Sequence, residues 1–223
     1  MSLRPQAHDI ITFWLFNTVV KSQLHYKKNP WKDVTISGFV LDPERKKMSK
    51  SKGNVIEPQE VIEKYSADAL RYWASSSKLG EDLSYQEKDI VTGKKFITKL
   101  LNSSRFVFMN LKDYKPKKID LVETDRIFLI QLNKLIETCT KSFDNYSYFR
   151  SKLETDNFFW SDFCANYLEL VKNRVYNGTK KEKESAFYTL YYSLLTLLKL
   201  FAPITPFITE EIYQNYFRKN DLD

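Results

Sequence analysis

Cysteine and histidine are scarce in this chain of 223 residues, which has two of each: Cys139, Cys164, His8 and His25. The two cysteines have no histidine near them, so they cannot supply the four ligands of a structural zinc site. We expect no protein-bound metal. We also expect both thiols to be reduced and buried on helices, in a cytoplasmic protein.

Long apolar runs are also absent. Residues 10–20 form the most apolar stretch near the N-terminus, which is too short to cross a bilayer, and the run 188–208 is broken by a lysine and two prolines. The first five residues lack the basic start and apolar core of a secretory signal. The sequence therefore predicts no membrane partner.

Glycine and proline are few, at 5 and 7 residues, whereas 43% of the residues are apolar and 15% are aromatic. This composition excludes a disordered chain and is sufficient for one or two packed cores. The net charge of +7 favours a polyanionic partner without proving one.

Basic residues gather in "ERKKMSKSKGNVIEP", residues 44–58, which we call the lysine loop. Ser49 and Ser51 lie between lysines and leave the backbone N–H groups accessible, and Gly53-Asn54 permits positive φ. Amides, hydroxyls and ammonium groups could therefore converge on one anion. Charge alone leaves two alternatives open, a solvated loop and a nuclear-localisation run.

The N-terminal part is typical of an α/β layer. The segment "HDIITFWLFNTVVKSQL" predicts a helix with a wide buried face, and "DVTISGFVLD", residues 33–42, predicts a buried strand. One strand makes no sheet, so we expect the rest of the sheet to lie upstream. The chain would then be an excised piece of a larger protein, with Met1-Ser2 as a vector leader. The apolar faces of this helix and strand would be partly exposed or covered by a neighbouring molecule.

The remainder is predicted to be helical. Pro58 begins a short helix, Ser66 caps the next, Thr124-Asp125 caps a long helix, and Gly178 ends another. Short connections favour antiparallel neighbours and a helix bundle. The long helices are expected at residues 87–111, 126–143, 158–176, 182–202 and 206–217.

Residues 47–51 spell KMSKS, the second signature of class I aminoacyl-tRNA synthetases. The motif follows "GFVLD" and precedes "KGNVIEP" and "VIEKYSADALRYW", and this whole string resembles the valine, isoleucine, leucine and methionine enzymes. "LRPQAHDIITFWLF" and "SSKLGEDLSYQEKDIVTGKKFITKLLNSSRFVF" look like the valine enzymes, particularly the archaeal-type form. "FWSDFCANYLELVKNRVY" and "LKLFAPITPFITEEIY" are similar to the anticodon-binding bundle. The resemblance covers the whole chain, with the isoleucine enzymes as the alternative.

This resemblance implies a mainly α chain, in which the C-terminal remnant of a Rossmann-like catalytic domain precedes a helical anticodon-binding bundle. Residues 1–86 would end the catalytic domain and carry the lysine loop and a stem-contact segment. Residues 87–124 would be a connecting helix and linker. Residues 125–223 would be the bundle, truncated at its C-terminus.

The resemblance also implies a reaction: valine is activated by ATP, supplied as its Mg²⁺ complex, and then passes to the 3′ end of valine tRNA. Lys50 would neutralise the leaving pyrophosphate, with Lys47 supporting it and Ser49 and Ser51 adding hydrogen bonds. Since no covalent enzyme intermediate forms, the rate comes from positioning and charge stabilisation.

Other family positions match less closely. Gly38 and Phe39 lie where the family backbone meets adenine. Asp9 falls near the position that touches the ATP ribose, although "QAHD" departs from the usual Gly-x-Asp pattern. The first class I signature, His-x-Gly-His, is absent, as are the valine pocket and the editing domain. Valine would therefore bind through the missing N-terminal part, and we expect the fragment to be inactive alone. A stand-alone tRNA-binding module is the alternative.

Two sets of residues bear on tRNA binding. Lys94, Lys95 and Lys99 face one side of a predicted helix and are candidates for phosphate contacts. The aromatic residues of the segment 158–167, Trp160 among them, are expected in the core rather than as base-stacking platforms.

Overall fold

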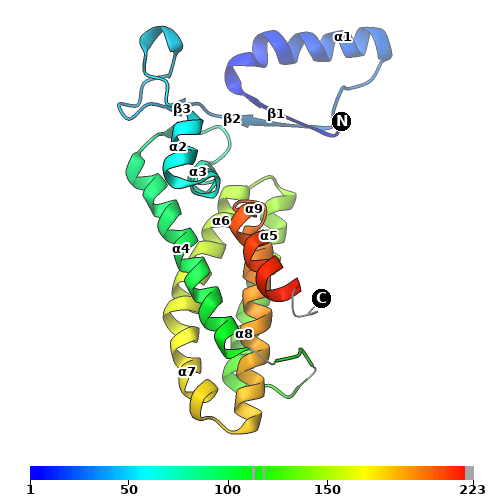
Figure 1. The fold of residues 1–223 in the computed structure, drawn as a ribbon. Coiled ribbons are helices and arrows are strands. Elements are labelled where there is room, and N and C mark those ends of the chain that lie inside the picture. Colours follow the sequence, from blue (N-terminus) through cyan, green and yellow to red (C-terminus); the bar gives the residue numbers. More distant parts are fainter. Residues whose placement is uncertain (112–113, 118, 219–223) are drawn as a thin grey trace.

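The computed structural model describes residues 1–111, 114–117 and 119–218; the last five residues of the predicted bundle segment 125–223 lie outside the described residues. An α/β part lies at one end, and the long helix α4 (Glu87–Asn110) runs from it into a helix bundle (Figure 1). The chain is mainly α, as predicted.

The N-terminal unit is a strand–helix–strand crossover. Strand β1 (Leu3–Ala7) pairs in parallel with β2 (Asp33–Ser37), and α1 (Phe16–Tyr26) lies between them in sequence. The expectation of a lone strand was therefore wrong. The sequence "LRPQA" gave no strand signal because it contains a proline and no β-branched or aromatic residue.

The predicted strand 33–42 is divided between two sheets. Strand β2 ends at Ser37, and β3 (Val40–Leu41) pairs in parallel with β4 (Leu83–Ser84). The break falls at Gly38, where a Cβ atom would lie 2.2 Å from the carbonyl oxygen of Glu81. The strand therefore changes partners at the one residue that allows this close approach.

The apolar face of the first helix is exposed, as expected from the incomplete sheet, whereas its pattern alone predicts a wide buried face. A short 3₁₀ turn and a π-helical turn (Ile11–Leu15) lead into α1, and no residue of the three segments is buried. Phe13 is 74% exposed and Phe16 is 62% exposed. Trp14 of the π-helical turn stacks on the buried Trp31, with ring centroids 5.6 Å apart.

Helices α2 (Pro58–Tyr65) and α3 (Ala67–Ala74) begin as predicted. Pro58 is the first residue of α2, and the Ser66 hydroxyl accepts a hydrogen bond from the Ala69 backbone N–H at 3.3 Å. Helix α4 packs closely on α3 at Gly93, where a Cβ would lie 2.8 Å from the Ala69 carbonyl oxygen. A small core forms here, centred on Val61, Ala69, Trp73 and Ile90.

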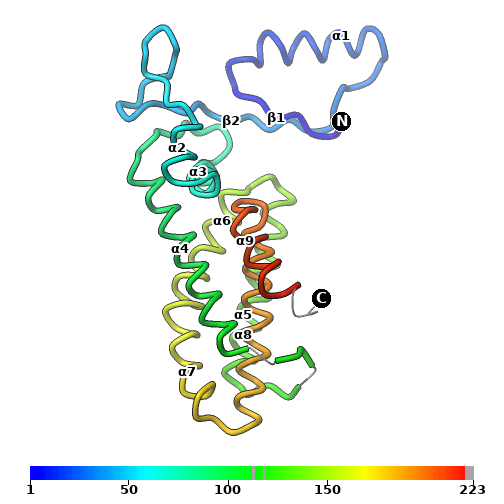
Figure 2. Tube along the Cα trace, in the orientation of Figure 1, coloured from blue at the N-terminus to red at the C-terminus, as the bar shows by residue number. Residues whose placement is uncertain are grey.

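The other helices of the bundle pack along the lower part of α4 (Figures 1 and 2). Its largest fully buried side chains are aromatic or aliphatic, among them Phe96, Phe159, Phe163 and Phe201. Its elements are α5 (Glu123–Asp144), α6 (Tyr148–Asn157), a π-helical segment (Phe158–Tyr167), α7 (Leu168–Asn177), α8 (Lys180–Phe201), α9 (Pro206–Ile212) and a final π-helical turn (Tyr213–Phe217). Cys139 and Cys164 are buried on helical segments with free thiols, as predicted.

One predicted helix boundary was wrong and one is confirmed with a different geometry. Helix α5 begins at Glu123 after Val122, without a side-chain cap, so Thr124-Asp125 lies inside its first turn. Helix α7 ends at Asn177 and is capped by Gly178 as predicted, but Gly178 has extended backbone (φ −68°, ψ 161°) rather than the left-handed conformation of a glycine cap. The chain instead enters α8 directly, through a capping box formed by Thr179 and Glu182.

The helix predicted at 158–176 begins ten residues earlier, with α6. The sequence "YFRSKLETDN" has no apolar stripe, because the side chains that α6 buries are Ser151, Lys152, Thr155 and Asp156. Hydrophobic periodicity does not detect a helix that packs through polar groups.

Helix α3 joins the α/β part to the bundle through three side chains. The Asp68 carboxylate accepts hydrogen bonds from the backbone N–H groups of Phe207 and Ile208, at 3.4 and 2.7 Å, and so caps α9. Arg71 donates to the Pro203 and Ile204 carbonyl oxygens after α8, both at 2.9 Å. Tyr72 donates to Asp156 on α6 at 2.6 Å.

Candidate functional site

The lysine loop is built on the carboxylate of Asp42, at the end of β3. Its Oδ1 accepts hydrogen bonds from the backbone N–H groups of Glu44 and Lys46 at 2.9 and 2.8 Å. The Lys46 N–H and the Asn54 amide hold the pKa of Asp42 below its usual value. The carboxylate therefore stays charged at neutral pH and fixes the turn that opens the loop.

Asn54 closes the loop from the other side. Its side-chain amide donates to Asp42 Oδ2 at 2.7 Å and to the Lys47 carbonyl at 3.3 Å, and its Oδ1 accepts the Ser49 N–H at 2.9 Å. Sequence reasoning gave Asn54 a backbone role with positive φ. In the structure it is Gly53 that has the positive φ (66°), and Asn54 holds the loop through the hydrogen bonds of its side chain.

Between Asp42 and Asn54 in the sequence, Lys50–Lys52 form a 3₁₀ turn with exposed side chains. The Ser49 and Ser51 hydroxyls lie 3.3 Å apart. Within the described part of the chain, the Lys50 ammonium has no ion pair or hydrogen bond. The turn therefore presents an unpaired cation beside two hydroxyls.

Asp9 and Lys47, both candidate residues, come together on Phe39. The Lys47 Nζ lies 3.7 Å from Asp9 Oδ2 and 3.9 Å from the centre of the Phe39 ring. His8 packs on the same ring, with centroids 4.3 Å apart. The pair is exposed, so its role is to orient the lysine more than to stabilise the fold.

The backbone of Phe39 is already engaged. Its N–H donates to Asp82 Oδ1 at 2.7 Å, and its carbonyl accepts the Leu83 N–H at 2.8 Å. The Phe39 N–H is therefore not available to a ligand. Asp42 and Asp82 are the site residues that sequence reasoning missed, and Asn54 is the one whose role it misassigned. "GFVLD" placed Asp42 at a strand end, where side chains collect, and this was the one available signal.

The structure also brings Lys94, Lys95 and Lys99 together, some distance from the lysine loop. They line one groove on α4, with a volume of about 470 Å³. We call this the lysine groove. Its full lining is Val91, Lys94, Lys95, Thr98, Lys99, Asn102 and Trp160.

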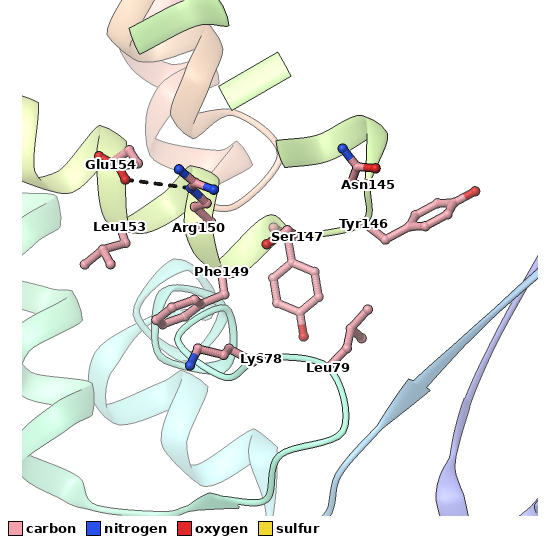
Figure 3. A pocket seen from close by; sticks show the side chains of 10 residues that line it. Lys78, Leu79, Asn145, Tyr146, Ser147, Phe149, Arg150, Leu153 and Glu154 are labelled. Atoms are coloured by element: carbon pink, nitrogen blue, oxygen red, sulfur yellow. Dashed lines mark ion pairs between the residues drawn. The ribbon is translucent and has the colours of Figure 1, made fainter. Parts of the chain in front are cut away.

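A second hollow, of about 530 Å³, lies between α6 and the loop that follows α3 (Figure 3). Lys78 of that loop lies beside Phe149, 5.6 Å from its ring centre, and Arg150 is paired with Glu154 at 3.9 Å. Tyr146 points away from the hollow, and its hydroxyl donates to Asp33 on β2 at 3.1 Å. The hollow thus lacks converging unpaired cations and is a poor anion site.

Two family comparisons bear on this geometry. Residues 2–86 match the family described as tRNA synthetases class I (I, L, M and V), and residues 125–222 match the anticodon-binding domain of tRNA ligase. The chain belongs to the class I tRNA synthetases. Their second signature, KMSKS, is the part of the lysine loop that Asp42 and Asn54 hold.

Relatives within this family agree with the predicted resemblance to the valine enzymes. The chain is 44% identical to a valine–tRNA ligase of Orientia tsutsugamushi, over 99% of this chain and 27% of the relative. It is 43% identical to those of Rickettsia prowazekii and Picrophilus torridus, over 100% and 99% of this chain and 29% and 28% of the relatives. The resemblance is confirmed, and the chain spans less than a third of these relatives' length.

Solved synthetase structures share the fold. A LeuRS of Agrobacterium radiobacter, in a ternary complex with tRNA and LeuAMS, superimposes with a TM-score of 0.74 at 20% identity, over 96% of this chain and 27% of that chain. A methionyl-tRNA synthetase of Mycobacterium tuberculosis, in complex with methionyl-adenylate, gives 0.75 at 20% identity, over 95% and 43%. The catalytic remnant and helical anticodon domain predicted from sequence are thus the observed fold class.

Proposed function

We propose that this chain is the part of a valine–tRNA ligase that supplies the lysine loop and a tRNA-binding bundle. The parent enzyme would activate valine with ATP and transfer it to the 3′ end of valine tRNA. The single observation that carries the proposal is the similarity to valine–tRNA ligases along the whole length of this chain. We assign residues 1–86 to the catalytic side, 87–124 to the connection and 125–223 to the bundle.

In this proposal Lys50 meets the pyrophosphate that leaves ATP. Its ammonium is exposed on a turn fixed from both sides, so it requires little rearrangement to meet developing charge. Ser49 and Ser51 would donate hydrogen bonds to the same phosphates. Removing one preorganised donor of this kind costs about 3–4 kcal/mol of transition-state stabilisation.

Lys47 and Asp9 would act on the other side of the nucleotide. Lys47 is oriented by Asp9 and Phe39, which places its charge beside the loop. Asp9 would accept a hydrogen bond from the ribose, and the backbone of Gly38 would meet the adenine edge. Phe39 would contribute its ring, because its own N–H and carbonyl are engaged.

Magnesium would arrive as part of the ATP complex rather than as a resident ion. The described residues contain no group of three or more His, Cys, Asp or Glu side chains that could hold a metal. None of their helices is long and apolar enough to cross a bilayer. We propose a cytoplasmic enzyme, with valine tRNA, ATP and valine as its partners.

A chimeric enzyme tests this proposal. The segment of the Rickettsia prowazekii valine–tRNA ligase that matches this chain would be replaced by it, and valine-dependent ATP–pyrophosphate exchange and tRNA charging measured. We expect exchange and charging of valine tRNA. We expect Lys50→Ala to slow exchange about 10²–10³-fold with little change in valine affinity, because the charge it meets develops in the transition state.

Two controls make the result decisive. Lys52→Ala removes a neighbouring exposed charge from the same turn and is expected to have a much smaller effect. The isolated chain is expected to bind tRNA without exchange activity. A folded chimera that exchanges no valine, or Lys50→Ala that weakens valine binding at an unchanged rate, would contradict the proposal. Tighter binding of isoleucine tRNA than valine tRNA would favour the isoleucine alternative.

A further inference from the structure

Trp160 departs from the aromatic residues around it. Phe159 and Phe163 are completely buried and Phe158 is 7% exposed, whereas Trp160 is 38% exposed and lines the lysine groove. The segment Phe158–Tyr167 is π-helical, so its side chains do not follow the α-helical register of the flanking helices. Such segments are rare and frequent at functional sites. The sequence expectation that Trp160 lies in the core is therefore corrected.

Three lysines of α4 line the same groove as this indole. Lys94, Lys95 and Lys99 lie within six residues of α4, and none is within 4 Å of a carboxylate in the described part of the chain. Lys94 Nζ has one neighbour of another kind, the Tyr65 ring at 5.9 Å. The groove therefore combines uncompensated positive charge with an accessible aromatic face.

The indole is held in place from behind. Its ring meets the buried Phe159 ring edge-on, with centroids 5.7 Å apart. Phe159 in turn packs on Phe96 and Phe201 in the core, with centroids 5.6 and 5.8 Å apart. These contacts restrain the indole before any ligand binds, which lowers the entropic cost of stacking on it.

We infer that the lysine groove binds an unpaired nucleotide of RNA, with its base stacked on Trp160 and its flanking phosphates met by Lys94, Lys95 and Lys99. The inference rests on the proposed function, since valine tRNA is the RNA in question. A nucleotide fits this combination because it carries both a flat π-face and negative charge. Stacking on one aromatic side chain contributes about 1–3 kcal/mol per base, and lysines supply the salt-dependent part.

The test labels the full chain with 5-fluorotryptophan, which gives one ¹⁹F resonance for each of the four tryptophans. Trp160→Phe identifies the Trp160 resonance. The labelled chain is titrated with valine tRNA, with inorganic polyphosphate as a polyanion without bases, and with poly-glutamate as an acidic peptide. We expect the Trp160 resonance to move with tRNA and to stay in place with the other two.

Affinity measurements complete the test. Trp160→Ala is expected to weaken tRNA binding about 5- to 150-fold, which is the stacking energy converted to a binding ratio. Trp160→Phe is expected to recover most of that loss because it retains a stacking face. The matched control is Tyr26→Ala, which removes an exposed aromatic ring from α1, far from the groove (Figure 1). It is expected to leave affinity unchanged.

The outcomes separate this inference from the proposed function. If tRNA binds while the Trp160 resonance does not move, the inference is overturned and the proposed function stands. If tRNA does not bind at any salt concentration, the tRNA-binding part of the proposed function is contradicted, and the inference is contradicted with it. Equal movement with poly-glutamate would reassign the groove to an acidic protein partner. The ¹⁹F readout uses the unaltered fold, so it decides the matter even if Trp160→Ala is unstable.

Discussion

At Gly38 the chain passes so close to residues 81 and 82 that no side chain fits. A Cβ atom would lie 2.2 Å from the Glu81 carbonyl oxygen and 2.6 Å from the Asp82 nitrogen, and both are backbone atoms that cannot rotate away. Gly38→Ala should therefore separate β3 from β4. We expect a loss of about 2–3 kcal/mol in the free energy of unfolding of the α/β part. Urea denaturation measures it.

Gly80→Ala is the control for this prediction. Gly80 has a φ of 82° with nothing within 4 Å of its added Cβ, so substitution adds backbone strain without a clash. The expected cost is about 1–2 kcal/mol. An equal or larger effect at Gly80 would show that close approach at Gly38 is unimportant.

The thiol of Cys164 gives a second prediction at this scale. Burial raises its pKa to about 11. Because the folded state favours the neutral thiol, its contribution to stability is complete below the unfolded pKa of about 9 and is lost as pH rises towards 11. In a Cys139→Ala background, the native chain should react with a disulfide reagent far more slowly at pH 8 than the urea-unfolded chain. Similar rates in the two states would refute the prediction.

Individual residues of the site were predictable to different degrees. The lysines, serines and Gly38 follow from a short motif, because such motifs are local in sequence. Asp42 and Asn54 are twelve positions apart and meet only when the loop folds back, so their hydrogen bond cannot be read from spacing. Asp82 reaches Phe39 across 43 residues. Hydrogen bonds between residues this far apart in sequence can be identified only from the structure.

Among the elements, α5, α7 and α8 share one buried ion pair. Asp125 is completely buried, receives two hydrogen bonds of 2.7 Å from the Arg174 guanidinium, and is also bonded by Tyr167 and Ser185. Arg174→Met should cost about 3–5 kcal/mol because it leaves a buried carboxylate without its counter-charge. Thermal and urea unfolding of the chain provide the measurement.

Two further variants isolate the ion pair. Lys172→Met removes the exposed Lys172–Glu169 pair on the same helix, and we expect a cost of at most about 1 kcal/mol. Adding Asp125→Asn to Arg174→Met should restore part of the lost stability, because the uncompensated charge disappears. If the double variant is less stable than Arg174→Met alone, the loss comes from packing instead.

Helices and strands of this chain differ in how readily the sequence predicts them. Helices α4, α8 and α9 carry apolar stripes and recognisable starts, so they were predicted closely. Helix α6 buries serine, threonine, lysine and aspartate, and β1 is a five-residue strand with a proline, so neither has the periodicity that prediction requires. The exposed face of α1 was expected from the incomplete sheet and not from its apolar pattern, because such a pattern does not reveal what packs on it.

At the scale of the whole molecule, α3 and α4 link the part that carries the lysine loop to the bundle (Figure 2). Asp68→Ala removes the cap that α3 gives to α9, and an N-cap of this kind contributes about 1–2 kcal/mol. Hydrogen exchange should become faster in α3 and at the start of α9, with α5 unchanged. Uniform acceleration along the chain would show that the two parts unfold as one unit.

The same joint sets an order of events during synthesis. Asp68 and Arg71 leave the ribosome early, but their partners lie 132 to 140 residues further along the chain. Contacts across such separations form late, because a long stretch of chain must first be ordered. The nascent chain therefore carries α3, with the lysine loop ahead of it, undocked until almost the entire bundle has emerged. Until that moment the exposed lysines belong to an α/β part that is not yet docked on the bundle, and they are open to any nucleic acid nearby, including the ribosome's own RNA.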